Sequence, residues 1–396
     1  TCAVDLAMFH DSSGPRRLKP MLDELKAPIW DKRKVVLVLD HYVPERDDES
    51  RRIVQIARDW AAEQALPHVI DSQGICHIVV PERGLIRPGM FCVGGDSHSP
   101  TGGAFGAYMF GIGATEMLGV VVTGSIWLDV PQTIFMHWNG RLAAGVSAKD
   151  MMLAMLGRFG MNGGRYQAVE YTGDAVRALS MAERMTLANM SAELGAQVGL
   201  VAPDATTRDW LAQRGVVVAD SELAHWRSDD SAEGERHVFD ATTLAPQVAA
   251  PHSPANVTAV SALERTPVQV AYIGACTGAK LDDLRAAAAV LQGRRIASGV
   301  ELLVAPASVA ERGVAEQDGT MAALVAAGAT VLPSACGACA GYGGAIAQGS
   351  TVISSTARNF EGRMGAADAR VYLGSPYTVA ASALRGWISD AREVLA

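Results

Sequence analysis

The sequence predicts an α/β protein with several domains built on parallel sheets, and three observations support this. The chain has 396 residues, which at roughly 150 residues per domain favours two or three domains. Hydrophobic residues make up 49% of the chain and charged residues 19%, enough for large buried cores. Short runs rich in Val and Ile alternate with helical patterns in the first and last thirds, which is typical of parallel sheets covered by helices.

The first third shows this alternation most clearly. Apolar runs predict strands at 35–41, 67–73 and 90–95, and an amphipathic pattern predicts a helix over 50–66. A glycine-rich span at 101–124 contains G-x-G-x-x-E. We reject a dinucleotide site there, because we expect neither a clean strand directly before the span nor an acidic residue at the required distance after it.

The middle third is more helical. Amphipathic patterns predict helices at about 148–158 and 179–199, and the polar stretch at 226–236 is expected to be a surface loop. The prolines and small residues of 245–260 favour a connection between domains. The last third returns to alternation, with predicted strands at 268–275, 300–306 and 330–334 and predicted helices at 281–293 and 307–327.

Charge and cysteine content exclude several classes of protein. The net charge is −8, from 34 basic and 42 acidic residues, and no Lys/Arg run is long enough to bind nucleic acid. No stretch approaches ~18 uninterrupted apolar residues, so we expect no membrane span and a soluble, cytoplasmic protein. Six cysteines are too sparse for a disulfide framework, and clustered cysteines in a reducing compartment indicate metal binding or catalysis.

Two cysteine motifs follow predicted strands, where open α/β sheets place their ligand sites: IGACTGAK at 273–280 and SACGACAG at 334–341. Cys336 and Cys339 form a C-x-x-C, and Cys276 is placed equivalently. The C-x-x-C is compatible with a metal or cluster site, a redox pair or a structural coincidence. The other cysteines are interpreted as small apolar residues: Cys2, Cys76 and Cys92.

The number of candidate ligands helps to distinguish a zinc site from an iron–sulfur cluster. A structural zinc site takes four protein ligands, whereas a cubane cluster held by three thiolates leaves one iron open to substrate as a Lewis acid. A zinc or redox C-x-x-C protein stays open as an alternative, and it predicts no iron–sulfide chromophore.

A set of motifs spans nearly the whole chain: HDSSGP at 10–15, DHYVP at 40–44, GICH at 74–77, GDSHSPTGGAFG at 95–106, NMSAELGA at 189–196, the three cysteines, and ARNFEGRMG at 357–365. In order and spacing this set resembles the aconitase superfamily, especially the large subunits of isopropylmalate isomerase and homoaconitase. The resemblance implies three α/β/α domains around a cluster-binding cleft, without the family's swivelling fourth domain. The expected domains are 1–132, 133–264, intertwined with the first, and 265–396.

The resemblance also implies a cofactor and a reaction. Cys276, Cys336 and Cys339 would hold a [4Fe–4S] cluster, and the reaction would be dehydration of a 2-hydroxy di- or tricarboxylic acid, usually followed by rehydration at the neighbouring carbon. The implied catalytic residues are Asp40 and His41 at the leaving hydroxyl, Asp96 and His98 in the same proton network, and Glu193 beside the iron-bound water or hydroxyl. The implied substrate-binding residues are His10, His77, Ser97, Asn189, Arg358 and Arg363.

Two of these assignments have support from residue chemistry. On a helix over 179–199, Asn189 and Glu193 are four positions apart and would share one face. A carboxylate beside an amide suits proton handling near a metal. Arg358 and Arg363 offer planar guanidinium groups, which match a carboxylate in bidentate fashion.

The resemblance further implies a partner. In this family the base that removes the carbon-bound proton is a serine on the swivelling domain, so a small subunit is expected to supply it, together with the loop that selects the substrate side group. The chain departs from the family pattern at Gly278 and Ala357, where asparagine is usual, and in SACGACAG, which lacks the usual proline and leucine. These departures suggest a shift among related hydroxy acids. A non-catalytic or regulatory cluster-binding protein is the alternative function.

Overall fold

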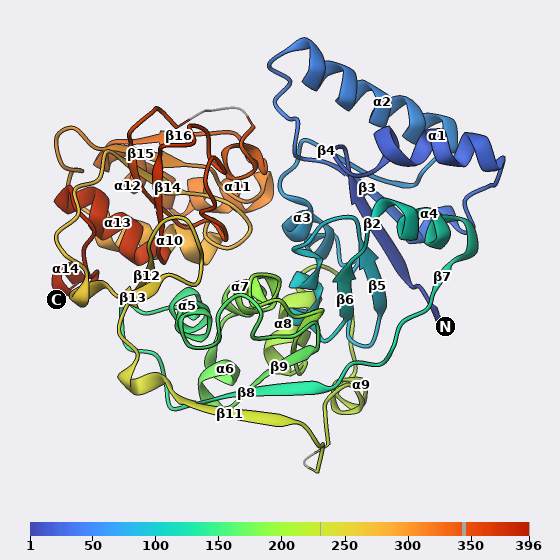
Figure 1. The fold of residues 1–396 in the computed structure, drawn as a ribbon, viewed down its shortest axis with the longest axis horizontal. Helices are drawn as coiled ribbons and strands as arrows, with labels where there is room; N and C mark the ends of the chain where they lie inside the picture. The colour runs from blue at the N-terminus through green and yellow to red at the C-terminus, as the bar shows by residue number, and fades with distance from the viewer. Residues whose placement is uncertain (230, 343–345, 396) are drawn as a thin grey trace.

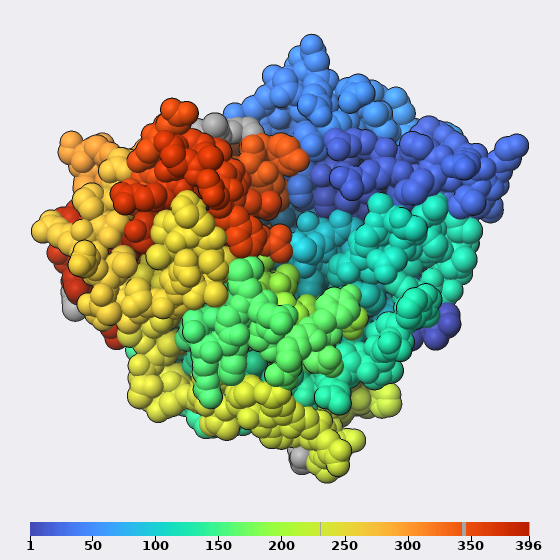
Figure 2. Space-filling model, in the orientation of Figure 1, coloured from blue at the N-terminus to red at the C-terminus, as the bar shows by residue number. Residues whose placement is uncertain are grey.

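The structure, a computed structural model, describes residues 1–229, 231–342 and 346–395 and contains three larger sheets, each flanked by helices (Figure 1). A two-stranded antiparallel pair, β1 (Cys2–Ala3) and β7 (Ser125–Ile126), accompanies them. Figure 2 shows that the three parts of the chain, blue to teal, green, and orange to red, adjoin around a common centre. The predicted α/β class is confirmed.

The first sheet is entirely parallel, in the order β4-β3-β2-β5-β6. Strands β2 and β3 are buried along their full length, as continuous apolar runs in parallel sheets are. Helices α1, α2 and α4 pack on one face and α3 with the 3₁₀ helix η2 on the other. The elements are β2 (Leu6–His10), α1 (Pro15–Leu25), η1 (Lys32–Lys34), β3 (Val35–Leu39), α2 (Asp48–Gln64), β4 (His68–Asp71), α3 (Cys76–Glu82), β5 (Phe91–Gly94), η2 (Ser99–Phe105), β6 (Tyr108–Gly111) and α4 (Ala114–Thr123).

As expected, the glycine-rich span 101–124 does not open directly after a strand, because it begins inside η2. Strand β6 lies within the span and runs into the G-x-G-x-x-E segment, and α4 follows it. The carboxylate of Glu116 accepts a hydrogen bond from the backbone N–H of Gly113 at 2.9 Å. The helix N-terminus, where a pyrophosphate would bind, therefore already holds an anion.

The second sheet is also parallel, in the order β10-β9-β8-β11. The predicted helix over 179–199 is wrong beyond Met190. After it the chain tightens into turns, in which the N–H of Glu193 bonds to the Met190 carbonyl at 3.0 Å, and Gly195 adopts a positive φ of 78°. The elements are β8 (Thr133–Asn139), α5 (Ala148–Phe159), β9 (Ala168–Thr172), α6 (Asp174–Ala178), α7 (Met181–Met190), β10 (Val198–Val201), α8 (Ala205–Ala212), α9 (Asp220–His225), β11 (Glu235–Asp240) and η3 (Ala241–Thr243).

The third sheet is mixed, in the order β13-β12-β18-β17-β14-β15-β16. The segment 245–260 is not only a connection, because its strands β12 and β13 pair antiparallel at the edge of this sheet. The predicted helix over 307–327 is broken at Gly319, whose φ is +85°. The elements are β12 (Gln247–Ala249), β13 (Val257–Ala259), η4 (Val260–Ala262), β14 (Val270–Ile273), α10 (Leu281–Leu291), β15 (Glu301–Val304), α11 (Val309–Gln317), α12 (Thr320–Ala327), β16 (Ala329–Val331), η5 (Gly337–Ala340), β17 (Thr351–Ser354), β18 (Arg370–Leu373), α13 (Pro376–Arg385) and α14 (Arg392–Leu395).

The domain boundaries stay a prediction. The third sheet begins at Gln247, before the boundary expected at 264/265. The expected surface loop at 226–236 includes Asp230, which lies outside the described residues, and the last part of it, from Glu235, belongs to β11. Among the described residues, no helix is both long and apolar enough to span a membrane.

Two buried carboxyl groups, those of Glu82 and Glu311, lie where the helices of the first and third sheets meet, and they predict an effect of pH on stability. Ser308 donates to Glu82 at 2.7 Å, and Glu311 accepts from the Leu281 N–H at 3.2 Å. Burial and the neighbouring Glu82 raise the pKa of Glu311 to about 8. A raised carboxyl pKa means that ionisation opposes folding, so this destabilisation is absent below the ordinary pKa and grows as the pH rises through about 8.

We therefore predict that Glu311→Gln raises the melting temperature at pH 8.5 and changes it little at pH 5. Each unit of raised pKa corresponds to about 1.4 kcal/mol at high pH. The measurement is thermal unfolding followed by circular dichroism at both pH values. A variant that is stabilised equally at pH 5 and pH 8.5 would show that ionisation of Glu311 is not the cause.

Candidate active site

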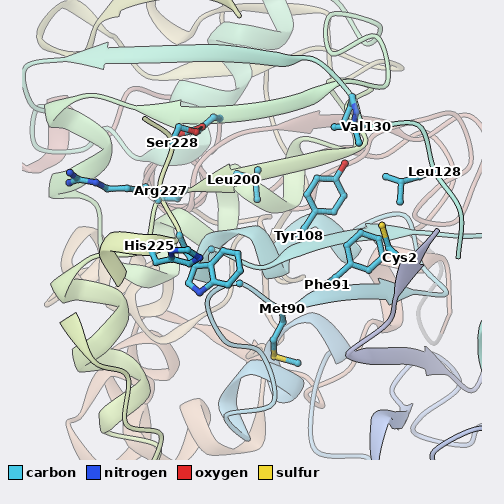
Figure 3. A pocket seen from close by; sticks show the side chains of 17 residues that line it. Cys2, Met90, Phe91, Tyr108, Leu128, Val130, Leu200, His225, Arg227 and Ser228 are labelled. Carbon is cyan, nitrogen blue, oxygen red and sulfur yellow. Dashed lines mark hydrogen bonds between the residues drawn. The ribbon is translucent and has the colours of Figure 1, made fainter. Parts of the chain in front are cut away.

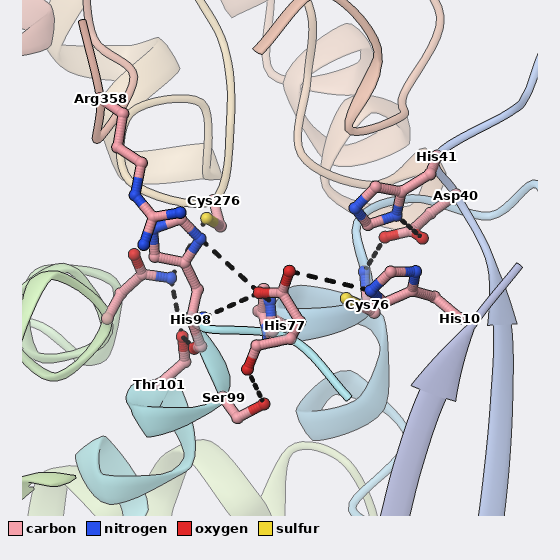
Figure 4. A network of polar contacts seen from close by, with 12 residues as sticks. His10, Asp40, His41, Cys76, His77, His98, Ser99, Thr101, Cys276 and Arg358 are labelled. Atoms are coloured by element: carbon pink, nitrogen blue, oxygen red, sulfur yellow. Dashed lines mark hydrogen bonds and ion pairs between the residues drawn. The ribbon is translucent and has the colours of Figure 1, made fainter. Parts of the chain in front are cut away.

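Polar side chains from all three sheets converge where parallel strands end, the edge at which α/β proteins carry their sites. His10 ends β2, and Asp40 follows β3. Asp96 follows β5, Cys276 follows β14 and Arg358 follows β17 after a short turn. Figure 4 shows the side chains of His10, Asp40, Cys276 and Arg358 lying in one region, with His41, His77 and His98 among them. The structure thus brings together residues that the sequence separates by more than 300 positions.

Asp40 and His41 form a buried ion pair. Oδ1 of Asp40 lies 2.7 Å from Nδ1 of His41, and its Oδ2 accepts from the Cys76 N–H at 2.7 Å. Burial opposes a charge on His41, but the Asp40 carboxylate outweighs it and raises the pKa of His41 to about 9. His41 therefore carries a proton at neutral pH, and because Nδ1 faces Asp40, its Nε2 is the nitrogen left for another group.

His10 stacks on His41, with ring centroids 3.8 Å apart and planes inclined by 11°. Its side chain is only 4% exposed, and neither ring nitrogen has a hydrogen-bond partner among the described protein residues. The nearest contact of Nε2 is Oδ2 of Asp96 at 3.7 Å, which is too long for a hydrogen bond. An uncommitted buried imidazole of this kind is suited to contact a bound molecule.

Asp96 connects two further histidines. Its Oδ1 lies 2.7 Å from Nε2 of His77 and accepts from the backbone N–H of His98 at 2.7 Å. The attraction of His77 overcomes the effect of burial and holds the pKa of Asp96 well below its usual range. Burial lowers the pKa of His77 despite this carboxylate. Asp96 is therefore ionised, and it fixes both histidine motifs in position.

Glu193 links the first and third sheets. Its Oε1 accepts from Nε2 of His98 at 2.9 Å and from Nε of Arg358 at 2.7 Å. Burial opposes the charge, but His98 and Arg358 together lower the pKa of Glu193. Its Oε2 is buried and has no protein partner within the described ranges. Glu193 thus presents one free carboxylate oxygen inside the site.

Asn189 lies on a helix, as predicted, but Glu193 does not. It lies on α7, whereas Glu193 lies in the turn that follows, so the two do not share a helix face as the sequence suggested. Nδ2 of Asn189 donates to the sulfur of Cys276 at 3.1 Å and to Thr101 at 2.8 Å. Asn189 and Glu193 still lie in one network. Thr101, which accepts from Asn189, donates to the carbonyl of His98, and the ring of His98 contacts Glu193.

The three motif cysteines all face the same region. Cys276 and Cys339 are 6% and 5% exposed, and Cys336 is half-buried. The backbone N–H of Cys336 donates to the Asp40 carbonyl at 2.9 Å, which ties the C-x-x-C to the first sheet. A hydrogen bond from Cys336 lowers the pKa of the Cys339 thiol to about 6, and Arg363 contributes in the same direction. The same hydrogen bond raises the pKa of Cys336, and burial raises the pKa of Cys276 to about 12. Of the three thiols, Cys339 is therefore the one whose surroundings favour the thiolate form that metal ligation requires.

The donor set fits a sulfur-ligated cluster. The three thiols offer soft ligands, and the Asn189 amide donates to one of the sulfurs, as groups around iron–sulfur clusters do. Ala275, directly before Cys276, has a φ of +71°, a strained conformation of the kind found at functional sites.

Histidine and carboxylate groups also lie close enough for a metal: His10, Asp11, Asp40 and His41, and separately His77, Asp96 and His98. In the first set the carboxylates are already occupied. Asp11 accepts from the N–H groups of His41 and Tyr42, and Asp40 from His41 and Cys76. We interpret these sets as a proton network.

Two predicted substrate-binding residues, Ser97 and Arg363, have polar groups without a hydrogen-bond partner among the described residues. Ser97 is exposed and lines, with Asp96, a cavity of about 410 Å³ beside the 192–197 segment. Nε of Arg363 is buried without a partner among the described residues. The geometry leaves both side chains available to a ligand.

The two missing asparagines do not open the site. A Cβ at Gly278 would lie 2.3 Å from the side chain of Ser355, and the Ala357 side chain packs in the apolar core of the second sheet. Neither substitution therefore creates space in the site, and the suggested shift among related hydroxy acids stays a prediction.

Sequence reasoning missed three functional neighbours: Asp11, Thr101 and Lys149. Asp11 orients the His41 segment through backbone N–H groups, and its position next to His10 was the available signal. Lys149 contacts the turn before Arg358, and no local pattern marks it.

An apolar cavity of about 450 Å³ lies elsewhere (Figure 3). Phe91 and Tyr108 of the first sheet, Leu200 of the second, and Trp226 line it, and none of the predicted site residues does. Large apolar pockets are common ligand sites. Here the polar convergence of Figure 4 is the better candidate, because it holds the perturbed titratable groups.

Comparison with known proteins identifies relatives over nearly the whole chain. A family model described as "Aconitase family (aconitate hydratase)" matches residues 2–267 and 261–386. The "3-isopropylmalate dehydratase large subunit 1" of Methanopyrus kandleri is 40% identical, covering 99% of this chain and 94% of that protein. The "Probable methanogen homoaconitase large subunit" of Methanosarcina mazei is 40% identical, covering 99% of each.

A solved structure shares the fold. The holo-form of Thermococcus kodakaraensis aconitase X superposes with a TM-score of 0.50, at 13% sequence identity, over 90% of this chain and 84% of the other. At this identity the similarity concerns the fold alone.

The Glu193–Arg358 pair predicts a stability effect. Glu193→Ala leaves the largely buried Arg358 guanidinium without its carboxylate, so the free energy of unfolding should fall by about 3 kcal/mol. The control is Glu316→Ala, which breaks an exposed pair with Arg312 and should cost less than about 1 kcal/mol. Urea unfolding followed by circular dichroism measures the free energy of unfolding of both variants. Equal losses in the two variants would contradict the prediction.

Proposed function

The chain belongs to the aconitase family, and from this premise we propose that it is the large subunit of a hydro-lyase. The enzyme removes water from a 2-hydroxy di- or tricarboxylic acid, such as isopropylmalate or a related alkylmalate, and returns it. The observation that carries the proposal is the buried network joining the His41–Asp40, His77–Asp96 and His98–Glu193–Arg358 contacts beside three cysteines.

We propose that Cys276, Cys336 and Cys339 hold a [4Fe–4S] cluster. Their soft sulfur donors, and the Asn189 amide that donates to one of them, support this assignment. When bound, the cluster supplies a Lewis acid that polarises the substrate hydroxyl.

The proton needed by the leaving hydroxyl is held on His41. Its pKa of about 9 keeps the ring protonated, and Asp40 fixes Nδ1, so Nε2 donates. Asp96 holds the ring of His77 and the backbone of His98, while the free Oε2 of Glu193 handles a proton on the water side of the reaction. These roles divide donation and acceptance between separate groups.

Substrate carboxylates are assigned to the arginines. Nε of Arg358 is engaged by Glu193, and no described residue accepts from its Nη groups, so these remain for a carboxylate. Arg363 and Ser97 complete the anion contacts, with His10 and His77 lining the pocket. The guanidinium groups exclude substrates that lack a second carboxylate.

A small subunit is proposed to complete the site. The relatives are named large subunits, which implies a smaller partner. We propose that this partner carries a swivelling domain whose serine removes the carbon-bound proton, and a loop that selects the substrate side group. In this proposal this chain activates the substrate hydroxyl, and the partner abstracts the carbon-bound proton.

The cluster assignment predicts metal content. Anaerobically reconstituted wild-type chain should contain close to four irons and four acid-labile sulfides, with broad absorption near ~400 nm. Cys276→Ser should lose most of this absorption, because one of three ligands is gone. Cys92→Ala, which changes a cysteine buried in β5, is the control and should keep it. Retention of full iron and sulfide by Cys276→Ser would refute the ligand assignment. A wild-type chain that stays colourless would favour the non-catalytic alternative.

The partner assignment predicts a dependence on the small subunit. The isolated chain with its cluster should dehydrate alkylmalates at least about 100-fold more slowly than the reconstituted pair, because general-base catalysis contributes on this scale. The ultraviolet absorbance of the unsaturated acid measures the rate. Full turnover by the isolated chain would place the base within it.

A further inference from the structure

Lys149 is a buried charge that the proposed mechanism does not use. It lies in the first turn of α5 and is 1% exposed. Its Nζ donates to the carbonyl oxygens of Thr356 at 2.6 Å and Ser355 at 3.2 Å. No carboxylate of the described residues forms an ion pair with it, so its hydrogen bonds to the two carbonyls stand against the cost of burying a positive charge near a helix N-terminus.

The two carbonyls belong to the turn that carries Arg358. Within this turn the Thr356 hydroxyl donates to the Arg358 carbonyl at 3.3 Å, and Arg358 reaches Glu193 from it. The Ser355 carbonyl also accepts from the Thr277 hydroxyl at 2.9 Å, one residue after Cys276. Lys149 therefore bonds to the place where the turn 354–358, which carries Arg358, meets the loop of Cys276 and Thr277.

The lysine makes this contact across two sheets. Helix α5 packs in the second core, whereas the turn follows β17 of the third sheet. Burial lowers the pKa of Lys149 to about 8, against the attraction of Glu193, Cys276 and Cys339. The amine is thus still mainly protonated at neutral pH and offers all its hydrogen-bond donors.

We propose that Lys149 is a positioning residue that fixes the 354–358 turn, and through it the guanidinium of Arg358, for binding of a substrate carboxylate. The contacts of Lys149 stand on the structure alone, while the role of Arg358 toward a substrate rests on the proposed function. Lys149 touches no reacting atom in this proposal and acts only through the turn.

The first test needs neither cluster, partner nor substrate. Lys149→Met keeps the length of the side chain but removes its donors, so hydrogen–deuterium exchange of the 354–358 amides in the isolated chain should accelerate at least tenfold. Arg184→Met is the control, since Arg184 is equally buried but bonds to Asp204 and the Arg177 carbonyl, away from the 354–358 turn and from Cys276. It should change these amides less than twofold.

Two results would overturn the proposal in this test. One is exchange at 354–358 that stays within twofold of wild type in Lys149→Met. The other is equal acceleration in Lys149→Met and Arg184→Met, which would indicate general loosening. If Lys149→Met does not fold, Lys149→Gln, which keeps one donor on a shorter side chain, takes its place with an expected acceleration of about threefold, and no acceleration would again overturn the proposal.

The second test uses the cluster-loaded pair. Lys149→Met should raise KM for the hydroxy acid about tenfold while kcat falls less than threefold, and Lys149→Arg should recover most of the loss in KM. A fall in kcat with unchanged KM would overturn the positioning role. An inactive wild-type pair would instead count against the proposed function, and the exchange experiment would still decide the role of Lys149.

Discussion

One carboxylate oxygen holds the candidate site together. Oε1 of Glu193, from the second sheet, accepts both the ring N–H of His98 from the first sheet and the guanidinium N–H of Arg358 from the third. An ionised carboxylate in a buried position is stable only with such partners, because desolvation otherwise costs more than the fold can supply. The three sheets are therefore coupled through this single acceptor, and the placement of the histidines and of Arg358 depends on it.

The parallel sheets explain why chemistry gathers at this centre. In the first and third sheets the functional residues follow strand ends. Backbone N–H groups are free there to orient side chains, as those of Tyr42 and His41 do for Asp11 and that of Cys76 does for Asp40. The charges alternate through the site, so that Asp40 supports a protonated His41 while Asp96 holds His77, whose pKa burial lowers. Neighbouring histidines thus acquire different protonation states from their surroundings alone.

Two buried polar residues at the edge of the site, Lys149 and Asn189, also connect segments of different sheets. Lys149 and Asn189 do not belong to the strand-end motifs, yet each bonds to a segment that carries one. These hydrogen bonds satisfy the buried polar groups and fix a turn in one case and a sulfur in the other. Most large effects of substitution at this site should therefore arise through loss of position.

The sequence by itself determined the α/β class, the approximate positions of the strands before Asp96, Cys276 and Cys336, and the cysteine and histidine motifs, because apolar runs and motif spacing are local properties. It could not determine where the 179–199 helix ends, since Gly195 and the turn after Met190 depend on contacts with other segments. It also could not give the direction of Ala357, which faces the second core, or the reach of Lys149 across two sheets. Only the tertiary structure decided these, because a side chain's environment is set by segments that are distant in the chain.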